Sequence, residues 1–196
     1  MGKNSTKYNI INILIVLLSM ILYFPINKFV SGGINLETQV DKQIPLISVF
    51  IIPYLIAPVL WIGFIIYANF KFERNNIKRI NISFILAGVI SSLIYIFIPT
   101  FVSRVEVHSN NFFSNLVSWL YANDNAYNAA PSGHTFYTVL CYLFLRKLYP
   151  KYNLGFLIVA SLIVLSTLFT KQHNIADVII GIIFALFVYF ISKVFT

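Results

Sequence analysis

Charged residues are scarce in this chain of 196 residues, and acidic ones are the scarcest. Asp and Glu together number 6 against 14 Lys and Arg, so charged residues make up only 10% of the sequence. A water-soluble domain of this size needs more charge than that to cover its surface. Apolar residues account for 59%, and the 19 Phe and 12 Tyr suit lipid-facing and interfacial positions. The composition therefore predicts an integral-membrane protein.

Cysteine and histidine are also sparse, which argues against two kinds of site. The one cysteine, Cys141, lies inside an apolar run, so it has no partner for an internal disulfide and a packing role is expected. No pair of Cys or His residues has the spacing of zinc or iron ligands. We therefore expect no metal site and no cofactor.

The excess of positive charge does not indicate a nucleic-acid partner. The net charge is +8, but the cations fall in short clusters between apolar runs instead of along one basic face. That distribution is typical of the positive-inside topology of membrane proteins. We therefore expect a membrane-embedded chain that does not bind nucleic acid.

Long apolar runs alternate with short polar connections, which predicts an all-α helical bundle with a single domain over residues 1–196. The runs predict six transmembrane helices, at 9–27, 46–69, 82–101, 134–149, 153–170 and 176–195. The first run is too long for the apolar core of a signal peptide, and no small-residue cleavage site follows it. We therefore expect a retained first span.

The spacing of apolar residues predicts two further helices that lie along the membrane surface, one within 28–45 and one within 102–132. Their apolar positions are Leu36, Val40 and Ile44 in the first, and Phe113, Leu116, Val117 and Leu120 in the second. The second helix either covers the bundle or grips lipid. Residues 71–79, between the second and third spans, are expected to form a short basic loop.

The distribution of Lys and Arg among the connections predicts the orientation of the bundle. With six spans and both termini cytoplasmic, ten cations lie inside and four outside, a clear bias. The ten are Lys3, Lys7, Lys71, Arg74, Lys78, Arg79, Arg146, Lys147, Lys151 and Lys193, and the four are Lys28, Lys42, Arg104 and Lys171. We expect the membrane to be that of a bacterial cell, with Arg104, His134 and His173 together at its non-cytoplasmic face.

Two polar islands at the edges of the spans carry the residues that could do chemistry. They are the stretches 130–135, with sequence APSGHT, and 171–177, with sequence KQHNIAD. Ionisable groups at the edge of a span are costly and are therefore functional candidates. His173 and Asp177 are four residues apart and would share a helix face, where the carboxylate could orient the imidazole as a nucleophile. The alternative is a structural pair.

The first island also suits phosphate binding. Ser132 is suited to cap the following helix, Gly133 lets the backbone approach a ligand, and N–H groups at a helix start bind anions. His134 could protonate a leaving alkoxide, although an ordinary serine-capped turn would have the same sequence. Arg104 and Lys171 would stabilise phosphoryl oxygens, unless the first is an interfacial anchor and the second a snorkelling side chain.

These stretches resemble the type 2 phosphatidic acid phosphatase (PAP2) superfamily, whose three motifs are Lys-x6-Arg-Pro, Pro-Ser-Gly-His and Ser-Arg-x5-His-x3-Asp. The second motif is intact at 131–134, and the third is present in part at 166–177. The resemblance implies a six-span enzyme with a metal-independent mechanism. It implies these roles: nucleophile His173, orienting carboxylate Asp177, general acid His134, and phosphate binding by Ser132 and Gly133.

The chain departs from the family pattern at positions where cations are expected. Thr167 stands in place of the arginine of the third motif, and Phe97 in place of the lysine of the first. Val105 follows Arg104 where the first motif has proline. We expect Lys171 to take over part of the missing positive charge.

The stretches 97–104 and 170–173 resemble the branch of the superfamily with inositol phosphorylceramide synthase-like and sphingomyelin synthase-like transferases, where small bacterial lipid phosphatases also occur. Water attacking a phosphohistidine gives hydrolysis, whereas a bound alcohol gives phosphotransfer. At this size we expect a phosphatase whose partner is a lipid phosphate drawn from the bilayer. A transferase, a catalytically degraded lipid-binding or transport relative, and a structural protein whose histidines merely pack are the alternatives.

Overall fold

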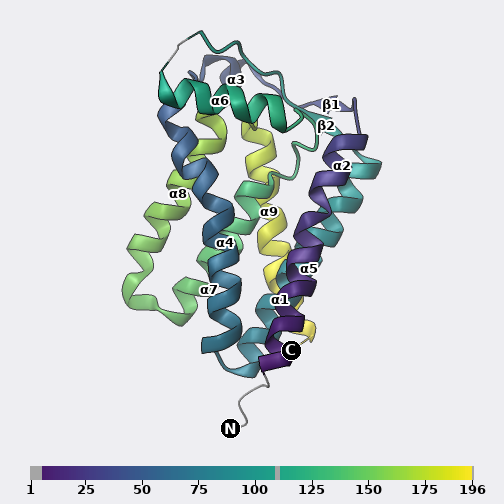
Figure 1. Ribbon diagram of the computed structural model, residues 1–196, viewed down its shortest axis with the longest axis vertical. Helices are drawn as coiled ribbons and strands as arrows, with labels where there is room; N and C mark the ends of the chain where they lie inside the picture. Colours follow the sequence, from purple (N-terminus) through teal and green to yellow (C-terminus); the bar gives the residue numbers. More distant parts are fainter. Residues whose placement is uncertain (1–5, 109–110, 196) are drawn as a thin grey trace.

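The computed structural model describes residues 6–108 and 111–195 as a bundle of long helices that run alternately up and down (Figure 1). The long helices are α1 (Thr6–Ile21), α4 (Ile51–Lys71), α5 (Arg74–Phe97), α7 (Gly133–Leu148), α8 (Asn153–Phe169) and α9 (Ile175–Ile191). A short helix, α2 (Tyr23–Phe29), continues the direction of α1.

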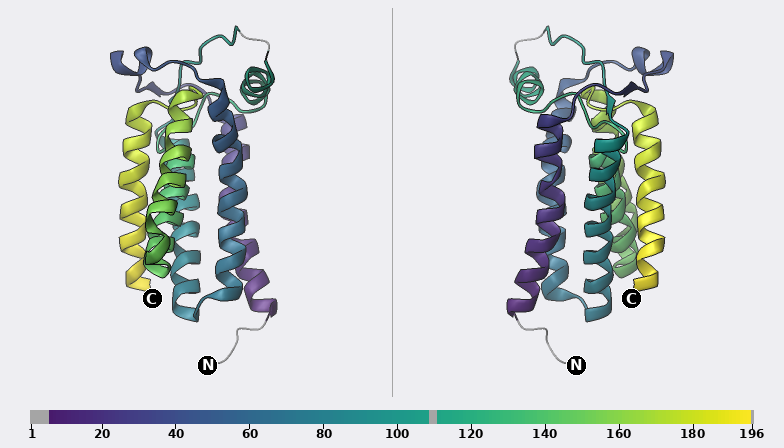
Figure 2. Two further views of the ribbon diagram at one scale, coloured as in Figure 1. Left: turned by 90° about the vertical axis from the view of Figure 1, so that its left-hand side faces the viewer. Right: turned by 90° about the vertical axis from the view of Figure 1, so that its right-hand side faces the viewer.

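Short elements gather at one end of the bundle, which we call the cap end (Figures 1 and 2). They are β1 (Ile34–Asn35), α3 (Gln39–Gln43), η1 (Ser48–Phe50), β2 (Thr100–Phe101) and α6 (Phe112–Asn123). The two strands pair in parallel, with Ile34 opposite Thr100. The short helices η2 (Pro150–Tyr152) and η3 (Ser192–Phe195) lie toward the opposite end. The cap end therefore holds the start of α7 and the turn between α8 and α9.

Five helical segments in the described part of the chain are long and apolar enough to cross a membrane. They are Thr6–Phe29, Ser48–Lys71, Arg74–Phe97, Pro150–Phe169 and Ile175–Phe195. These correspond to five of the six predicted spans. The remaining one, α7, has 16 residues, which is about 24 Å of helix against about 30 Å of hydrocarbon. A sixth span therefore stays a prediction.

The predicted basic loop at 71–79 is wrong, because helices occupy most of it. Helix α4 runs to Lys71 and α5 begins at Arg74, so only two residues connect them. Arg79 is buried, and its Nη2 donates a hydrogen bond to the carbonyl of Tyr189 at 3.0 Å. A cation that is held at the C-terminal end of α9 in this way is favoured by the helix dipole. The charges mark a helix that continues past the apolar region, not a loop.

The prediction of a helix within 102–132 is confirmed by α6, which lies across the ends of the long helices (Figure 1). Its inner residues Val117 and Leu120 are buried against Ile51 and Tyr54 at the start of α4. This helix therefore covers the bundle, and a role in gripping lipid stays a prediction. The short helix predicted within 28–45 corresponds to α3, which spans five residues.

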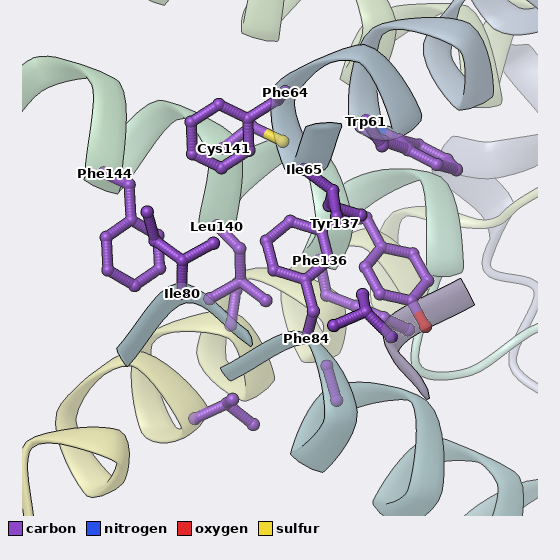
Figure 3. Close-up of a cluster of buried hydrophobic side chains, with 14 of the residues drawn as sticks. Trp61, Phe64, Ile65, Ile80, Phe84, Phe136, Tyr137, Leu140, Cys141 and Phe144 are labelled. Atoms are coloured by element: carbon purple, nitrogen blue, oxygen red, sulfur yellow. The ribbon is translucent and has the colours of Figure 1, made fainter. Parts of the chain in front are cut away.

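The centre of the bundle is an aromatic and aliphatic core to which α4, α5 and α7 contribute (Figure 3). The labelled side chains of this core are Trp61, Phe64, Ile65, Ile80, Phe84, Phe136, Tyr137, Leu140, Cys141 and Phe144. Phe136, Leu140 and Phe144 recur every four residues, so one face of α7 is continuously apolar. Cys141 is buried among these residues, as the sequence predicted. This packing fixes α7, and with it His134, against its neighbours.

Candidate functional site

A cavity of about 990 Å³ lies inside the cap end, and residues of α1, α2, α4, α5 and α6 line it. The loop at 124–129 lines it as well. Two further segments complete the lining, the first turn of α7 and the turn between α8 and α9. His134 comes from the first of these segments and His173 from the second, and both line the cavity. The two histidines of the sequence motifs therefore line one cavity, although 39 residues separate them in the sequence.

The turn before α7 is held by hydrogen bonds at each step. Ser132 is the N-cap of α7, and its Oγ accepts from the backbone N–H of Thr135 at 3.3 Å. The hydroxyl of Tyr95 donates to the carbonyl of Pro131 at 2.6 Å. Ser132 acts as a helix cap, as predicted. Gly133, which also lines the cavity, leaves room for a ligand close to the backbone.

His134 is positioned by aromatic contacts at the second residue of α7. Its ring stacks on Tyr54, with ring centroids 3.8 Å apart and an interplanar angle of 16°. Trp61 meets the same ring edge-on at 5.1 Å. Nε2 of His134 is buried and has no hydrogen-bond partner within the described residues. A positioned imidazole with one free nitrogen suits a general acid or base.

His173 precedes α9, and Asp177 lies in its first turn. Oδ2 of Asp177 accepts a hydrogen bond from the backbone N–H of Asn174 at 2.8 Å, as part of a capping box. The same oxygen lies 3.8 Å from Nδ1 of His173, which is longer than a hydrogen bond. Nδ1 of His173 and Oδ1 of Asp177 are both buried and unpaired in the part of the chain described. The carboxylate of Asp177 therefore lies near Nδ1 of His173 without a hydrogen bond to it.

The two motifs are tied to each other through the backbone. The N–H of Ser132 donates to the carbonyl of Asp177 at 3.1 Å, which links the start of α7 to the start of α9. Gly181 lies beside this link, and a Cβ there would come within 3.1 Å of the carbonyl oxygen of Ser132. The close approach of α7 and α9 therefore sets the relative position of the two histidines.

The structure places Arg104 against protein groups. Its Nη1 donates to the carbonyl of Tyr121 at 3.1 Å and to that of Asp124 at 2.5 Å. Its Nη2 donates to Oε1 of Gln172 at 2.9 Å, and its guanidinium lies 4.7 Å from the centroid of the Tyr121 ring. Arg104 is not among the described residues that line the cavity. Phosphate binding by this side chain stays a prediction.

Lys171 is held away from the cavity as well. It has a left-handed backbone conformation with φ of 55°, and its Nζ donates to the carbonyl of Asp41 at 2.7 Å. Burial lowers the pKa of Lys171, although the negative charges of Asp41 and Glu37 oppose this effect. Within the described lining Lys171 is absent, so its expected role as a replacement cation also stays a prediction.

The two positions where the family pattern has other cations do not face the site. The side chain of Phe97 is 77% exposed on the outside of α5. Thr167 is fully buried, and its Oγ1 donates to the carbonyl of Val164 in its own helix at 2.7 Å. Neither is among the described lining residues, so neither supplies a group to the cavity.

Sequence reasoning gave no role at the site to several polar residues that line the cavity, among them Lys28, Asp124, Asn128 and Gln172. Lys28 is the one cation among the described lining residues. Asp124 accepts a hydrogen bond from the hydroxyl of Tyr23 at 2.9 Å. Burial raises the pKa of Asp124. The hydrogen bond from Tyr23 and the electrostatic effects of Arg104 and His173 act in the opposite direction but do not outweigh burial. The one sequence signal for two of them was closeness to the motif histidines, since Gln172 adjoins His173 and Asn128 lies six residues before His134.

Buried polar atoms without a hydrogen-bond partner cluster at this site. Of the nine such side-chain atoms in the residues described, seven belong to the cavity or to the groups directly behind it. They are Arg104 Nε, Asn128 Nδ2 and Oδ1, His134 Nε2, Gln172 Nε2, His173 Nδ1 and Asp177 Oδ1. Buried polar groups are normally paired. A polar ligand entering the cavity would supply partners that the protein itself does not.

The apolar helices, together with the two imidazoles and the carboxylate gathered at one end of the bundle, fit a membrane protein of phosphatase type. The sequence matches the PAP2 superfamily over residues 33–191. The chain therefore belongs to that superfamily, whose members are phosphatases or related phosphoesterases. Comparisons with curated proteins and with solved structures gave no match.

Proposed function

We propose that this protein is an integral-membrane, metal-independent phosphatase that acts on a lipid phosphate through a phosphohistidine intermediate. The observation that carries the proposal is the meeting of His134 and His173 in one cavity, with Asp177 behind His173. His134, His173 and Asp177 come from two polar stretches about forty residues apart in the sequence. Packing alone gives no reason for these three side chains to meet at one cavity. Each also has an unpaired buried atom in the part of the chain that is described.

In the first step Nε2 of His173 attacks phosphorus while its Nδ1–H donates to the carboxylate of Asp177. The bond between phosphorus and the ester oxygen breaks, and the leaving alkoxide takes a proton from His134. The present 3.8 Å between Nδ1 and Oδ2 would shorten as the substrate binds, since catalytic hydrogen bonds are often long without ligand.

In the second step water attacks the phosphorus of the phosphohistidine, and the P–N bond breaks. His134, which is neutral after the first step, takes a proton from that water and returns to its starting form. The products are the lipid alcohol and inorganic phosphate. Both imidazoles are restored, and no oxidant, reductant or metal takes part.

The position of the cavity supports a substrate from the bilayer. Its deeper wall is apolar, with Leu17, Met20, Leu55 and Ile62 from α1 and α4 among its lining residues. The polar groups lie at the cap end, where the helices leave the apolar region. A lipid could therefore lie with its chains along the bundle and its phosphate beside His173.

The arrangement of cations supports an orientation with the cap end on the non-cytoplasmic side of a bacterial cell membrane and both termini in the cytoplasm. Lys28, Lys42, Arg104 and Lys171 lie at the cap end. Toward the opposite end lie Lys7, Lys71, Arg74, Lys78, Arg79, Arg146, Lys147, Lys151 and Lys193. Lys3, which also belonged to the predicted cytoplasmic set, lies outside the described residues. This orientation makes α7 the sixth span.

Transfer to an alcohol is the second candidate function, and the volume of the cavity favours it. At about 990 Å³ the cavity is much larger than one phosphoryl group, and Asp124 with Tyr23 could orient an acceptor hydroxyl. This reaction would suit the branch with inositol phosphorylceramide synthase-like enzymes. A lipid-binding or transport relative without turnover is the third, favoured by Phe97 and Thr167 at the positions of the expected cations.

The proposal predicts phosphate release by the purified protein from at least one member of a lipid panel. The panel contains phosphatidate, a prenyl pyrophosphate, phosphatidylglycerol phosphate and sphingolipid phosphates, each tested with EDTA and with an added alcohol. Replacing the nucleophile, His173→Ala, should reduce turnover by at least about 10³-fold. Phosphate release without alcohol distinguishes hydrolysis from transfer.

His108→Ala is the matched control for this variant. His108 is the third histidine of the chain, and its side chain is 83% exposed, 3.7 Å from Glu106. Its replacement should leave turnover unchanged. Turnover by His173→Ala that is equal to that of the parent protein, or loss of turnover in EDTA, would rule out the proposed mechanism. Lipid binding without turnover across the panel would favour the transport relative.

A further inference from the structure

Two neutral amide side chains face the cavity with unused hydrogen-bonding atoms. Asn128 is 2% exposed and Gln172 is 6% exposed, and both line the cavity with His134 and His173. Nδ2 and Oδ1 of Asn128 and Nε2 of Gln172 have no hydrogen-bond partner in the described residues. Amides buried this deeply are normally paired, so their free atoms point to a ligand.

The orientation of the Gln172 amide is fixed from behind by Arg104. Oε1 of Gln172 accepts a hydrogen bond from Nη2 of Arg104 at 2.9 Å, which leaves Nε2 as the free end. Both terminal nitrogens of Arg104 are already bonded to protein oxygens. The guanidinium charge therefore polarises the amide, and Gln172 presents the donor to the cavity.

The position of Asn128 is fixed by the loop that carries it. Its φ is 61°, a left-handed conformation that asparagine adopts more readily than most residues. The next residues are anchored to β2, where the N–H of Ala130 donates to Oγ1 of Thr100 at 2.7 Å. The side chain of Asn128 takes no part in this anchoring, so holding the loop does not account for the buried amide.

We propose that the amide N–H groups of Asn128 and Gln172 bind the phosphoryl oxygens of the substrate, in place of the cations absent at Phe97 and Thr167. This inference rests on the proposed function, since it assigns binding groups to the same reaction. Gln172 directly precedes His173 in the sequence, and both residues line the cavity in which the reaction would take place. Fixed donors aimed at oxygens that gain charge in the transition state account for a large part of catalysis in many enzymes.

In this arrangement Arg104 is a positioning residue that acts through Gln172. Among the described lining residues, Lys28 is the one cation, and it is exposed on α2. Neutral donors therefore carry most of the contact to the phosphoryl group in the interior of the cavity. Asn128 also has a free acceptor, Oδ1, which could bind a protonated phosphate oxygen or a head-group hydroxyl.

The variant Gln172→Glu tests the first donor with little change of shape. It keeps an oxygen for Arg104 and so preserves the tie behind the site, but it replaces the free N–H₂ by a carboxylate oxygen. Asn128→Asp and Asn128→Leu test the second donor with and without added charge. Each variant should lower kcat/KM by about 10²-fold and weaken inhibition by orthovanadate, an oxyanion similar to phosphate.

Asn123→Asp is the control, because Asn123 also lines the cavity but is exposed, and its Nδ2 is bonded to the carbonyl of Trp119. It adds the same charge without removing a buried free donor, and it should change kcat/KM less than threefold. Elution from a sizing column as a single species, with a thermal unfolding transition, establishes that each variant is folded.

The outcomes separate this inference from the proposed function. Folded variants at both positions with the kcat/KM and orthovanadate inhibition of the parent protein would overturn the inference and leave the phosphatase proposal standing. In a second outcome the parent protein shows no turnover, orthovanadate stabilises it against heat, and the variants lose this stabilisation. This outcome would support the amide site and overturn the phosphatase proposal. Neither turnover nor stabilisation of the parent would overturn both.

Discussion

Asp41, on α3, fastens the cap to the turn that carries His173. Oδ1 of Asp41 accepts a hydrogen bond from the backbone N–H of Ile175 at 2.7 Å, at the start of α9. Its other oxygen accepts from the N–H and the hydroxyl of Thr38, at 2.8 and 2.6 Å. The carbonyl of Asp41 holds Nζ of Lys171. The carboxylate of Asp41 therefore takes up a backbone N–H at the start of α9, where a ligand anion would otherwise bind. The carbonyl of the same residue binds the Lys171 ammonium that was expected at the site.

Replacing this carboxylate, Asp41→Asn, should destabilise the fold by about 1–3 kcal/mol, because charge-assisted hydrogen bonds are lost. Burial alone would raise the pKa of Asp41, but hydrogen bonds from Thr38 and Ile175, with the charge of Lys171, outweigh it and hold the pKa below its usual value. The stabilisation should therefore be complete above about pH 4 and be lost as pH falls through the lowered pKa.

Thermal unfolding of the parent protein and of Asp41→Asn across a pH series measures this difference. We expect a constant gap between the two midpoints from pH 7 to about pH 5 and a narrowing gap in more acidic solution. A gap that is absent at pH 7, or one that does not narrow in acid, would show that the carboxylate does not fasten the cap.

Single residues also show where the sequence is informative about the site. The predicted topology and the resemblance to the PAP2 superfamily indicated that two short motifs act together. These motifs contain Ser132, Gly133, His134, His173 and Asp177. The contacts of Arg104 and Lys171 were not predictable, because Gln172 and Asp41 lie 68 and 130 residues away in sequence. Asn128 and Gln172 were missed because a neutral amide in a polar stretch resembles an ordinary loop residue.

At the scale of elements, helix α1 packs against α5 through a glycine. A Cβ at Gly88 would lie 2.6 Å from the carbonyl oxygen of Ser19, which is backbone and cannot rotate away. Small residues at such contacts let membrane helices approach closely. Residues of α1 and α5 also line the cavity, so this contact sets the position of one of its walls.

We expect Gly88→Ala to separate α1 from α5 and to destabilise the protein by about 1–3 kcal/mol, as over-packing does. The matched control is Gly63→Ala in α4, where a Cβ would meet nothing within 4 Å. Thermal unfolding in detergent should show a lower midpoint for Gly88→Ala than for the parent protein. The midpoint of Gly63→Ala should equal that of the parent protein. Equal midpoints for Gly88→Ala and the parent protein would contradict the close packing.

The lengths of the elements were predictable only in part. Apolar runs located five of the helices that can span a membrane, because hydropathy reports burial in lipid directly. They misplaced the start of α5, since a helix that emerges from the membrane carries charges such as Arg74, Lys78 and Arg79 without ending. They also did not show that α2 follows α1 as a separate helix after Leu22.

At the scale of the whole molecule, the bundle has two unlike ends. The cavity and both histidines lie at the cap end. Most of the described cations lie at the other end, in or after the last turns of α4, α7 and α9 and in the first turns of α1 and α5. A phosphatase site at the cap end would draw its substrate from the leaflet away from these cations. The positive-inside tendency predicts that this is the outer leaflet.

Labelling of introduced cysteines tests this orientation in intact cells, in a Cys141→Ala background. Gln39 is exposed on α3 at the cap end, and Lys151 is exposed in η2 toward the other end. A membrane-impermeant maleimide should label Gln39→Cys without lysis and Lys151→Cys only after the membrane is opened. The opposite pattern would place the cavity on the cytoplasmic side. Labelling of both in intact cells would mean that α7 and α8 do not cross as a pair. Helices α4 and α5 return the chain to the cap end, so the crossing of α7 is what separates the two positions.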